Sequence, residues 1–512
     1  MLWGGRSICN KCKKERYNMK KVIIIVISFG LISCSNIGQK KLKIAVVDGL
    51  FSLDPHTQDE QITSEILGNV YESLVTFDID MNPIPLLATG YVSINDVTWR
   101  FYLRPNVVFH NKNKISSKDV IYSLERARSH STSVYRSLLA AIEKYETIDS
   151  LTVDIITVNP QPNLINTLAL ISIIPFNADP AKEPVGTGPY SVITYQPNSK
   201  LGLKYFPGYW QGEVDYKDVE FQVIDNDSLR LMSLLTGRVD IDANVMENYR
   251  EKISSSPGFT LITTVGTSIT ALGIKVSGKT KGNPLSDIRL RKAISLAIDR
   301  QKMIDQACCG QAVPARQMLT KSIFGYNPDM PPLIQDLPMA KRLVKSLGAK
   351  DSIRLTIKVS PPAALEGQLI AEDLRQAGIE LKVDILPWSK LYDQITNGQA
   401  DFFLMGFGYT FGDASELLND MIHSQGISNK YGSRNLFGYC NPKLDEKIEQ
   451  ADKEFNPTKR QVLLQEAVKI MTEDLPFIPL YIKDNNYGFR QGIRWRPKTG
   501  GAMYLKEIHP AI

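Results

Sequence analysis

Residues 401–414 read DFFLMGFGYTFGDA, and this stretch decides how the surrounding chain is interpreted. Its first eight residues form an apolar run with aromatic side chains, bounded by glycine-containing segments, which predicts a buried strand. A loop of aromatic side chains with one carboxylate, Asp413, follows the strand. Since ligands of open parallel α/β sheets bind just beyond the carboxyl ends of the strands, we expect this loop to face a ligand cleft.

The chain before this loop alternates strands and helices. Residues 354–359 (RLTIKV) and 379–385 alternate apolar and polar side chains, as half-buried strands do. Residues 365–377 carry apolar side chains at helical spacing, and a short helix is expected at 389–396. The order strand, helix, strand, helix, strand predicts parallel strands joined by right-handed crossovers, and therefore an α/β fold.

The composition is ordinary for a globular protein, with 43% apolar and 22% charged residues, and 512 residues are enough for two or three domains. The formal net charge of +6 comes from the first 33 residues, which hold seven Lys and Arg and one Glu. The rest of the chain is therefore neutral. Nucleic-acid binding requires clustered Lys and Arg to neutralise phosphates, so the composition argues against it.

The N-terminal segment has the features of a lipoprotein signal. Lys20 and Lys21 precede an apolar run at 22–32, which is shorter than the roughly 20 residues of a membrane span and predicts a signal peptide. The run ends in LISC, which resembles the bacterial lipobox and implies cleavage before Cys34 and lipid attachment to it. Met19 is a good start for this signal, so the residues before it are expected to be a misassigned or dispensable extension.

A helix is predicted to begin after Ser116, because Ser116 and Asp119 have the spacing of a capping box. Val120 and Leu124 belong to the apolar stripe of this helix. Tyr122 lies off the stripe, so its side chain faces either a cleft or the open surface, and the surface is the favoured interpretation.

Several motifs spread along the chain resemble one protein family. They are SLDPHT at 52–57, VGTGPY at 185–190, RKAISLAIDR at 291–300 and LPFIPLY at 475–481. Each motif alone is a weak signal. In combination they are similar to the family 5 extracellular solute-binding proteins, the dipeptide-, oligopeptide- and nickel-binding components of ABC importers. The resemblance runs from about residue 41 to the C-terminus.

The resemblance implies a two-lobed, type II periplasmic-binding-protein-like α/β fold with mixed sheets, an extra subdomain in the first lobe and a ligand cleft between the lobes. It implies a monomeric binding protein without a cofactor, whose partners are an ABC permease and an ATPase. The sequence contains no H-E-x-x-H or G-x-S-x-G motif that would indicate an enzyme. The expected boundaries are 1–18 for the extension, 19–33 for the signal peptide, 34–268 for lobe I with a subdomain inserted at about 80–184, 269–480 for lobe II, and 481–512 for the return to lobe I.

The resemblance also implies a ligand site at the loop that follows residues 401–408. In the family, an Asp in a D-x-x-D-P stretch commonly holds the α-amine of a bound peptide. The matching TFGDA places Thr410, which carries no charge, at that Asp. Asp413 either contacts the ligand or caps the next helix, and capping is the favoured interpretation. The ligand-binding residues expected overall are Leu50, Tyr122, Phe407, Tyr409, Thr410, Asp413, Arg434 and Asn435.

Metal binding is an alternative within the same family. Nickel-binding members use a His further along the chain, and His423, ten residues after Asp413, is the candidate here, although none of the five His has the i,i+4 spacing of a metal site. Cys308, Cys309 and Cys440 allow one disulfide to Cys440, or else are free thiols.

Three functions are consistent with these patterns. The leading one is a lipid-anchored component of an ABC importer that captures dipeptides or oligopeptides at the periplasmic or extracellular face of the cell envelope. The second is a nickel- or metallophore-binding member of the same family. The third, from another class, is an envelope lipoprotein that acts as an adhesin, a chaperone or a hydrolase.

Overall fold

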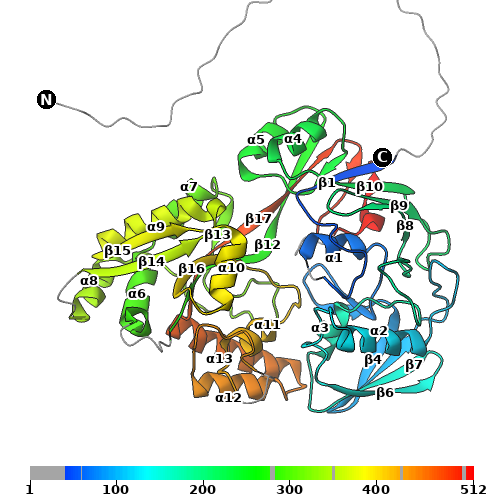
Figure 1. Ribbon diagram of the computed structural model, residues 1–512, viewed down its shortest axis with the longest axis horizontal. Helices are drawn as coiled ribbons and strands as arrows, with labels where there is room; N and C mark the ends of the chain where they lie inside the picture. The colour runs from blue at the N-terminus through cyan, green and yellow to red at the C-terminus, as the bar shows by residue number, and fades with distance from the viewer. Residues whose placement is uncertain are drawn as a thin grey trace, which may run out of the picture. The chain divides into compact units, whose positions relative to one another are not determined.

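One sheet of eleven described strands runs through both lobes of the molecule (Figure 1). The computed structural model describes residues 41–58, 60–276, 283–348, 352–426, 431–498 and 503–511. The strands follow the order β15-β14-β16-β12-β17-β11-β1-β10-β9-β8, and β13 pairs with β17. Their bounds are β1 (Leu42–Val46), β8 (Tyr190–Gln196), β9 (Lys200–Tyr205), β10 (Asp218–Val223), β11 (Ile241–Asp242), β12 (Phe259–Ile274), β13 (Ala312–Pro314), β14 (Ile353–Val359), β15 (Ile379–Ile385), β16 (Phe402–Phe407) and β17 (Phe477–Arg490).

The long strands β12 and β17 form an antiparallel ribbon that joins the lobes. Their pairing extends over most of both strands and shifts register between Val265 and Ile269. At Gly266 a Cβ would lie 2.4 Å from the carbonyl oxygen of Lys483, so this close approach requires glycine. Ile262 packs against the core of the first lobe, whereas Ile269 is buried in the core of the second. The ribbon is therefore the connection about which the lobes can hinge.

The first lobe is built on three parallel strands. β1 pairs in parallel with β10 on one side and with β11 on the other. Ile44 and Phe221 on these strands are fully buried, as expected where a sheet is covered on both faces. The remaining elements of this lobe are α1 (Gln61–Leu67), β2 (Val75–Phe77), β3 (Pro83–Pro85), α4 (Asp227–Leu235), η1 (Glu247–Tyr249), α5 (Arg250–Ser254), β18 (Ile493–Arg494), η5 (Leu505–Glu507) and β19 (His509–Pro510).

A smaller antiparallel sheet, with strand order β4-β5-β7-β6, forms a subdomain with a core of its own. Phe101 and Val153 from the sheet pack there with Leu124 from the helix α2. Asp119 accepts the backbone N–H of Ser116 at 2.8 Å, which is the capping-box bond that the sequence predicts at the start of α2. The elements are β4 (Ala88–Asn95), β5 (Thr98–Leu103), α2 (Ser117–Ser129), β6 (Ile142–Asp149), β7 (Thr152–Thr157) and α3 (Leu164–Ala169).

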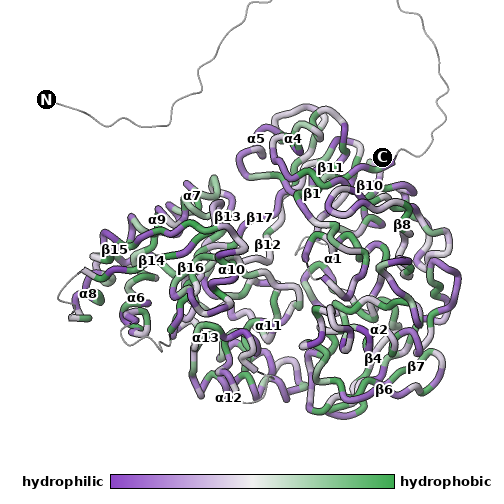
Figure 2. The backbone as a smooth tube through the Cα atoms, viewed as in Figure 1, coloured by the Kyte–Doolittle hydropathy of each residue, from purple (hydrophilic) through white to green (hydrophobic). Residues whose placement is uncertain are grey.

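The second lobe contains the predicted strand, helix, strand, helix, strand unit. β14 pairs in parallel with both β15 and β16, so the parallel arrangement is confirmed. Hydrophobic residues concentrate along β14 and β16 (Figure 2). The two faces of β16 are covered by different apolar clusters, one containing Phe402 and the other Phe403, whereas the apolar residues of β14 belong to the cluster with Phe402. The helices are η2 (Pro284–Ser286), α6 (Ile288–Ala297), α7 (Arg300–Ala307), α8 (Leu337–Ser346), η3 (Pro361–Ala363), α9 (Ala364–Gln376), α10 (Trp388–Thr396), α11 (Ser415–Leu417), the π-helical turn η4 (Leu418–Ile422), α12 (Pro442–Ala451) and α13 (Pro457–Asp474).

The three cysteines beyond the signal region are all free thiols. Cys308 is buried, whereas Cys309 and Cys440 are exposed, so the alternative of a disulfide to Cys440 is wrong for this structure. The predicted lipid attachment site, Cys34, lies outside the described residues. Within those residues, every helix is too short or too polar to cross a membrane.

Candidate functional site

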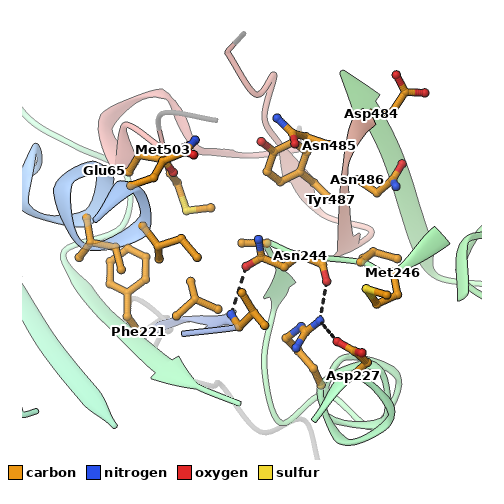
Figure 3. Close-up of a pocket in the computed structure, with 18 of the residues that line it drawn as sticks. Glu65, Phe221, Asp227, Asn244, Met246, Asp484, Asn485, Asn486, Tyr487 and Met503 are labelled. Atoms are coloured by element: carbon orange, nitrogen blue, oxygen red, sulfur yellow. Dashed lines mark hydrogen bonds and ion pairs between the residues drawn. The ribbon is translucent and has the colours of Figure 1, made fainter. Parts of the chain in front are cut away.

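A cavity of about 330 Å³ lies at the carboxyl ends of the three parallel strands of the first lobe (Figure 3). Val46 and Val47, where β1 ends, and Ala243 and Asn244, directly after β11, line it together with residues 484–487 of β17. Parallel strands place their ligands at this edge, because the chain turns away there and leaves backbone groups and loop side chains facing the space. The position therefore matches that of a ligand site in an α/β protein.

Asn244 and Arg230 form the fixed floor of this cavity. The side-chain oxygen of Asn244 accepts the backbone N–H of Val47 at 3.1 Å (Figure 3). Arg230 is fully buried, donates to the carboxylates of Asp242 at 3.0 Å and Asp227 at 2.6 Å, and also donates to the backbone carbonyl of Asn244 at 2.6 Å. Arg230 therefore holds the strand ends in place, and its charge is already balanced.

The walls of the cavity carry carboxylates from three elements, which are Glu65 on α1, Glu247 on η1 and Asp484 on β17. Burial raises the pKa of the Glu65 carboxyl to about 8. A hydrogen bond from Gln61 at 2.8 Å acts to lower this pKa, and the negative charge of nearby Glu60 acts to raise it further. Burial also raises the pKa of Asp484. Burial is the main cause of both raised pKa values; Arg250 opposes it at Asp484, whereas no nearby cation opposes it at Glu65.

A second cavity, of about 230 Å³, shares Gln61 and Glu65 with the first and brings the second lobe into the site. Tyr409 and Thr410, in the loop after β16, line it opposite residues of α1 and its neighbours such as Tyr71. The two cavities thus meet at Glu65. The loop that the sequence placed at a ligand cleft does contribute two of its expected residues here.

The backbone of that loop is fixed by Glu416. The Glu416 carboxylate accepts the N–H of Thr410 at 3.2 Å, the hydroxyl of Thr410 at 3.2 Å and the N–H of Phe411 at 3.1 Å. Burial raises the pKa of Glu416 to about 7, against the effect of these hydrogen bonds. A carboxylate is therefore hydrogen-bonded to Thr410, the residue at the position where the resemblance implied a ligand-binding Asp.

Two asparagines of the first lobe hold the same loop from the other side. The Asn166 side chain donates to the carbonyl of Phe411 at 2.9 Å, and the Asn163 side chain donates to the hydroxyl of Ser415 at 2.9 Å. Gly412 adopts a φ of +68°, and a Cβ there would lie 2.9 Å from a backbone carbonyl of the first lobe. The lobes are therefore in direct contact across the site.

Asp413 has a structural set of contacts. Its carboxylate accepts two hydrogen bonds from Arg460, at 2.5 and 2.9 Å, and both side chains are almost completely buried. Burial alone would raise the pKa of Asp413, but the charge and hydrogen bonds of Arg460 outweigh it and hold the pKa below its usual range. Asp413 also accepts the N–H of Ser415 at 2.9 Å, but the helix α11 begins at Ser415 with Ala414 at its N-cap position, so Asp413 lies one residue before the position that the capping prediction gave it. A larger cavity of about 1380 Å³ lies on this side of the loop.

Phe407, Tyr122 and Leu50 line neither of the two cavities that meet at Glu65. Phe407 is buried against Phe477, with ring centroids 4.9 Å apart. The Tyr122 hydroxyl donates to the carbonyl of Ala178 at 3.0 Å. Leu50 is buried in the first core with a φ of +61°. The contacts of these three residues in the structure are therefore packing and backbone support.

Arg434, Asn435 and His423 also lie away from the two cavities. Arg434 is exposed and pairs with Asp420 at 2.8 Å, and buried Asn435 donates to the carbonyl of His423 at 2.9 Å. His423 stacks on Tyr431, with centroids 4.3 Å apart. The described part of the chain holds no group of three or more His, Cys, Asp or Glu side chains arranged to bind a metal.

Sequence reasoning missed Glu65, Asn244 and Glu416. Ligands bind at the carboxyl ends of parallel strands, and in the first lobe this rule indicates Asn244, which lies two residues after the end of β11. Nothing in the local pattern distinguishes Glu65 or Glu416 from an ordinary charged residue on a helix.

Comparison with known proteins identifies the family. The model of the bacterial extracellular solute-binding proteins, family 5 Middle, matches residues 82–429, more than half of the chain. A glutathione-binding protein, GsiB, of Salmonella paratyphi A (strain ATCC 9150 / SARB42) is 26% identical over 463 residues, which cover 87% of this chain and 89% of that protein.

Two solved structures have the same fold. The periplasmic binding protein DppA from Helicobacter pylori, in complex with the peptide STSA, has a TM-score of 0.77 and 23% identity over 92% of this chain and 98% of its own. NikA from Staphylococcus aureus, in complex with Ni(L-His)2, has a TM-score of 0.75 and 22% identity over 92% of this chain and 100% of its own. This chain therefore belongs to the family 5 bacterial extracellular solute-binding proteins, which bind solutes for ABC importers and are not enzymes.

Proposed function

We propose that this protein captures short peptides and delivers them to an ABC permease and its ATPase. The observation that carries the proposal is the pair of cavities that meet at Glu65, one at the strand ends of the first lobe and one closed by Tyr409 and Thr410 of the second. Cavities of a few hundred Å³ with a small number of fixed polar groups suit small solutes. An extended peptide needs partners for its own N–H and C=O groups, and the side-chain NH2 of Asn244, whose oxygen accepts from Val47, can donate to one of its carbonyls.

The relatives support a peptide as the solute. The Salmonella relative is named for glutathione, which is a tripeptide, and the Helicobacter pylori structure holds a four-residue peptide. The expected nickel ligand of the present chain, His423, lies in a stack with Tyr431 away from both cavities, which argues against the nickel alternative.

Binding would act through closure of the lobes. The β12–β17 ribbon provides the hinge, and in the arrangement of the structure Asn163 and Asn166 of the first lobe contact the 409–415 loop of the second. A solute that contacts both lobes stabilises this closed form by its differential affinity, and the permease then recognises it.

We also propose that the protein works at the outer face of a membrane, held by lipid on Cys34 after removal of residues 19–33. The lysine pair, the short apolar run and the LISC sequence support this placement. A Cys34→Ala variant is expected to move from the membrane fraction to the soluble fraction of the cell envelope.

Native mass spectrometry of the protein purified from cells tests the proposal, because binding proteins with closed lobes often retain their solute. A bound mixture of masses that fragment as short peptides is the expected result. A bound metal complex would favour the nickel alternative. The absence of any retained solute, together with no thermal stabilisation across peptide and metal panels, would refute both.

A further inference from the structure

We propose that Glu65 is a specificity-determining residue that binds a positively charged group of the solute, so that the site selects peptides with a free ammonium group. This inference rests on the proposed function, since it concerns the same cavities. Glu65 stands on α1 where the two cavities meet, and it is therefore within reach of a solute in either one.

The first cavity offers negative charge without a free positive charge. Among its described lining residues the acids include Glu65, Glu247 and Asp484, and the one cation is Arg230. Arg230 is committed to two carboxylates and two backbone carbonyls. A carboxylate of the solute would therefore find no free cation among these lining residues. Of the acids, Asp227 pairs with Arg230 and Glu247 pairs with Lys483 at 3.9 Å. Asp484 lies near the Arg250 guanidinium, so Glu65 is the described lining acid without a nearby cation.

The second cavity shows the same balance. Its one described lining cation, Lys498, pairs with Glu507 at 3.1 Å and lies over the ring of Tyr504 at 4.4 Å. Its other carboxylates already have donors: Glu72 accepts hydrogen bonds from Thr187, Tyr209 and Trp210, and Asp78 accepts several from Asn82 and Asp80.

Glu65 differs from these neighbours, because the hydrogen bond that reaches its carboxylate comes from the neutral amide of Gln61. An ammonium of the solute would supply the positive charge that the site lacks. Glu416, directly behind Thr410, adds negative charge on the side of the second lobe. The two lobes thus favour a cationic solute together, and they disfavour one with net negative charge.

The test compares the binding of Ala-Ala-Ala and N-acetyl-Ala-Ala-Ala by isothermal titration calorimetry. Three proteins are measured, which are the full-length parent, Glu65→Gln and Glu143→Gln. Glu143→Gln is the control, because it removes the same charge from an exposed strand position. Gln keeps the size of Glu65 and its hydrogen bond to Gln61, and a thermal melt checks folding. We expect the parent protein and the control to prefer the free amine by about 10- to 100-fold, and Glu65→Gln to lose that preference.

The outcomes separate the two claims. Equal binding of both peptides by the parent protein, or a preference that survives in Glu65→Gln, overturns the role of Glu65 and leaves peptide capture intact. No binding of either peptide by the folded parent protein overturns the proposed function, and with it the inference about Glu65.

Discussion

Replacing Asp413 with Asn should destabilise the second lobe without removing a ligand contact. Asp413 and Arg460 have side chains only 3% and 6% exposed, and two hydrogen bonds join them. The Asn variant leaves the buried guanidinium without its counter-charge, which costs about 3 to 5 kcal/mol in comparable buried pairs. For a lobe of this size the melting temperature should fall by roughly 10 °C.

Asp420→Asn is the matched control, because it makes the same chemical change in a pair that is much less buried, with the Asp420 side chain 27% exposed. Asp420 contacts Arg434, whose side chain is 61% exposed, and such surface pairs contribute about 0 to 1 kcal/mol. Thermal and urea unfolding of the three proteins measures the difference. If Asp413→Asn melts like the parent protein but no longer binds peptide, Asp413 is a ligand group and the structural interpretation is wrong.

Three further variants test the site. Asn163→Ala combined with Asn166→Ala removes two hydrogen bonds between the lobes, each contributing about 1 kcal/mol. X-ray scattering of the solute-free protein should then show a larger radius of gyration. An unchanged radius would show that these two hydrogen bonds do not hold the lobes together. Glu65→Gln should stabilise the solute-free protein at pH 8 by about 1 to 3 kcal/mol and have little effect at pH 5. The folded state holds the Glu65 proton more tightly than the unfolded state does, because the folded pKa is raised. The free energy of unfolding of the parent protein therefore falls as the pH rises from near 4.5 to about 8, and Gln, which has no proton to lose, avoids that loss. Equal urea midpoints at both pH values would refute this. Thr410→Asp adds a carboxylate beside Glu416 and should strengthen binding of Ala-Ala-Ala several-fold at pH 8 by calorimetry; no change would show that position 410 does not face the solute.

The second lobe could be predicted largely from local patterns. The alternating residues of β14 and β15 and the apolar run of β16 carry their strand signal within a few residues, and the helices between them require parallel pairing. The capping box at Ser116 and Asp119 is equally local, because one residue type at each of two positions defines it.

The candidate site was harder to predict, because its contacts join distant parts of the chain. Asp413 meets Arg460 across 47 residues, and nothing near Asp413 indicates that partner. Asn166 reaches Phe411 across 245 residues. The orientation of Glu416 toward Thr410 follows from how the chain turns into the short helix α11, which sequence spacing does not specify. Patterns therefore located the loop but not the groups around it.

A crystal structure of the protein with the solute that it retains on purification tests the central claim most directly. We predict a short peptide between the lobes, with its ammonium beside the Glu65 carboxylate and its backbone near Asn244. A solute bound instead in the larger cavity beside Arg316 and Asp413, or one whose carboxylate faces Glu65, would contradict it.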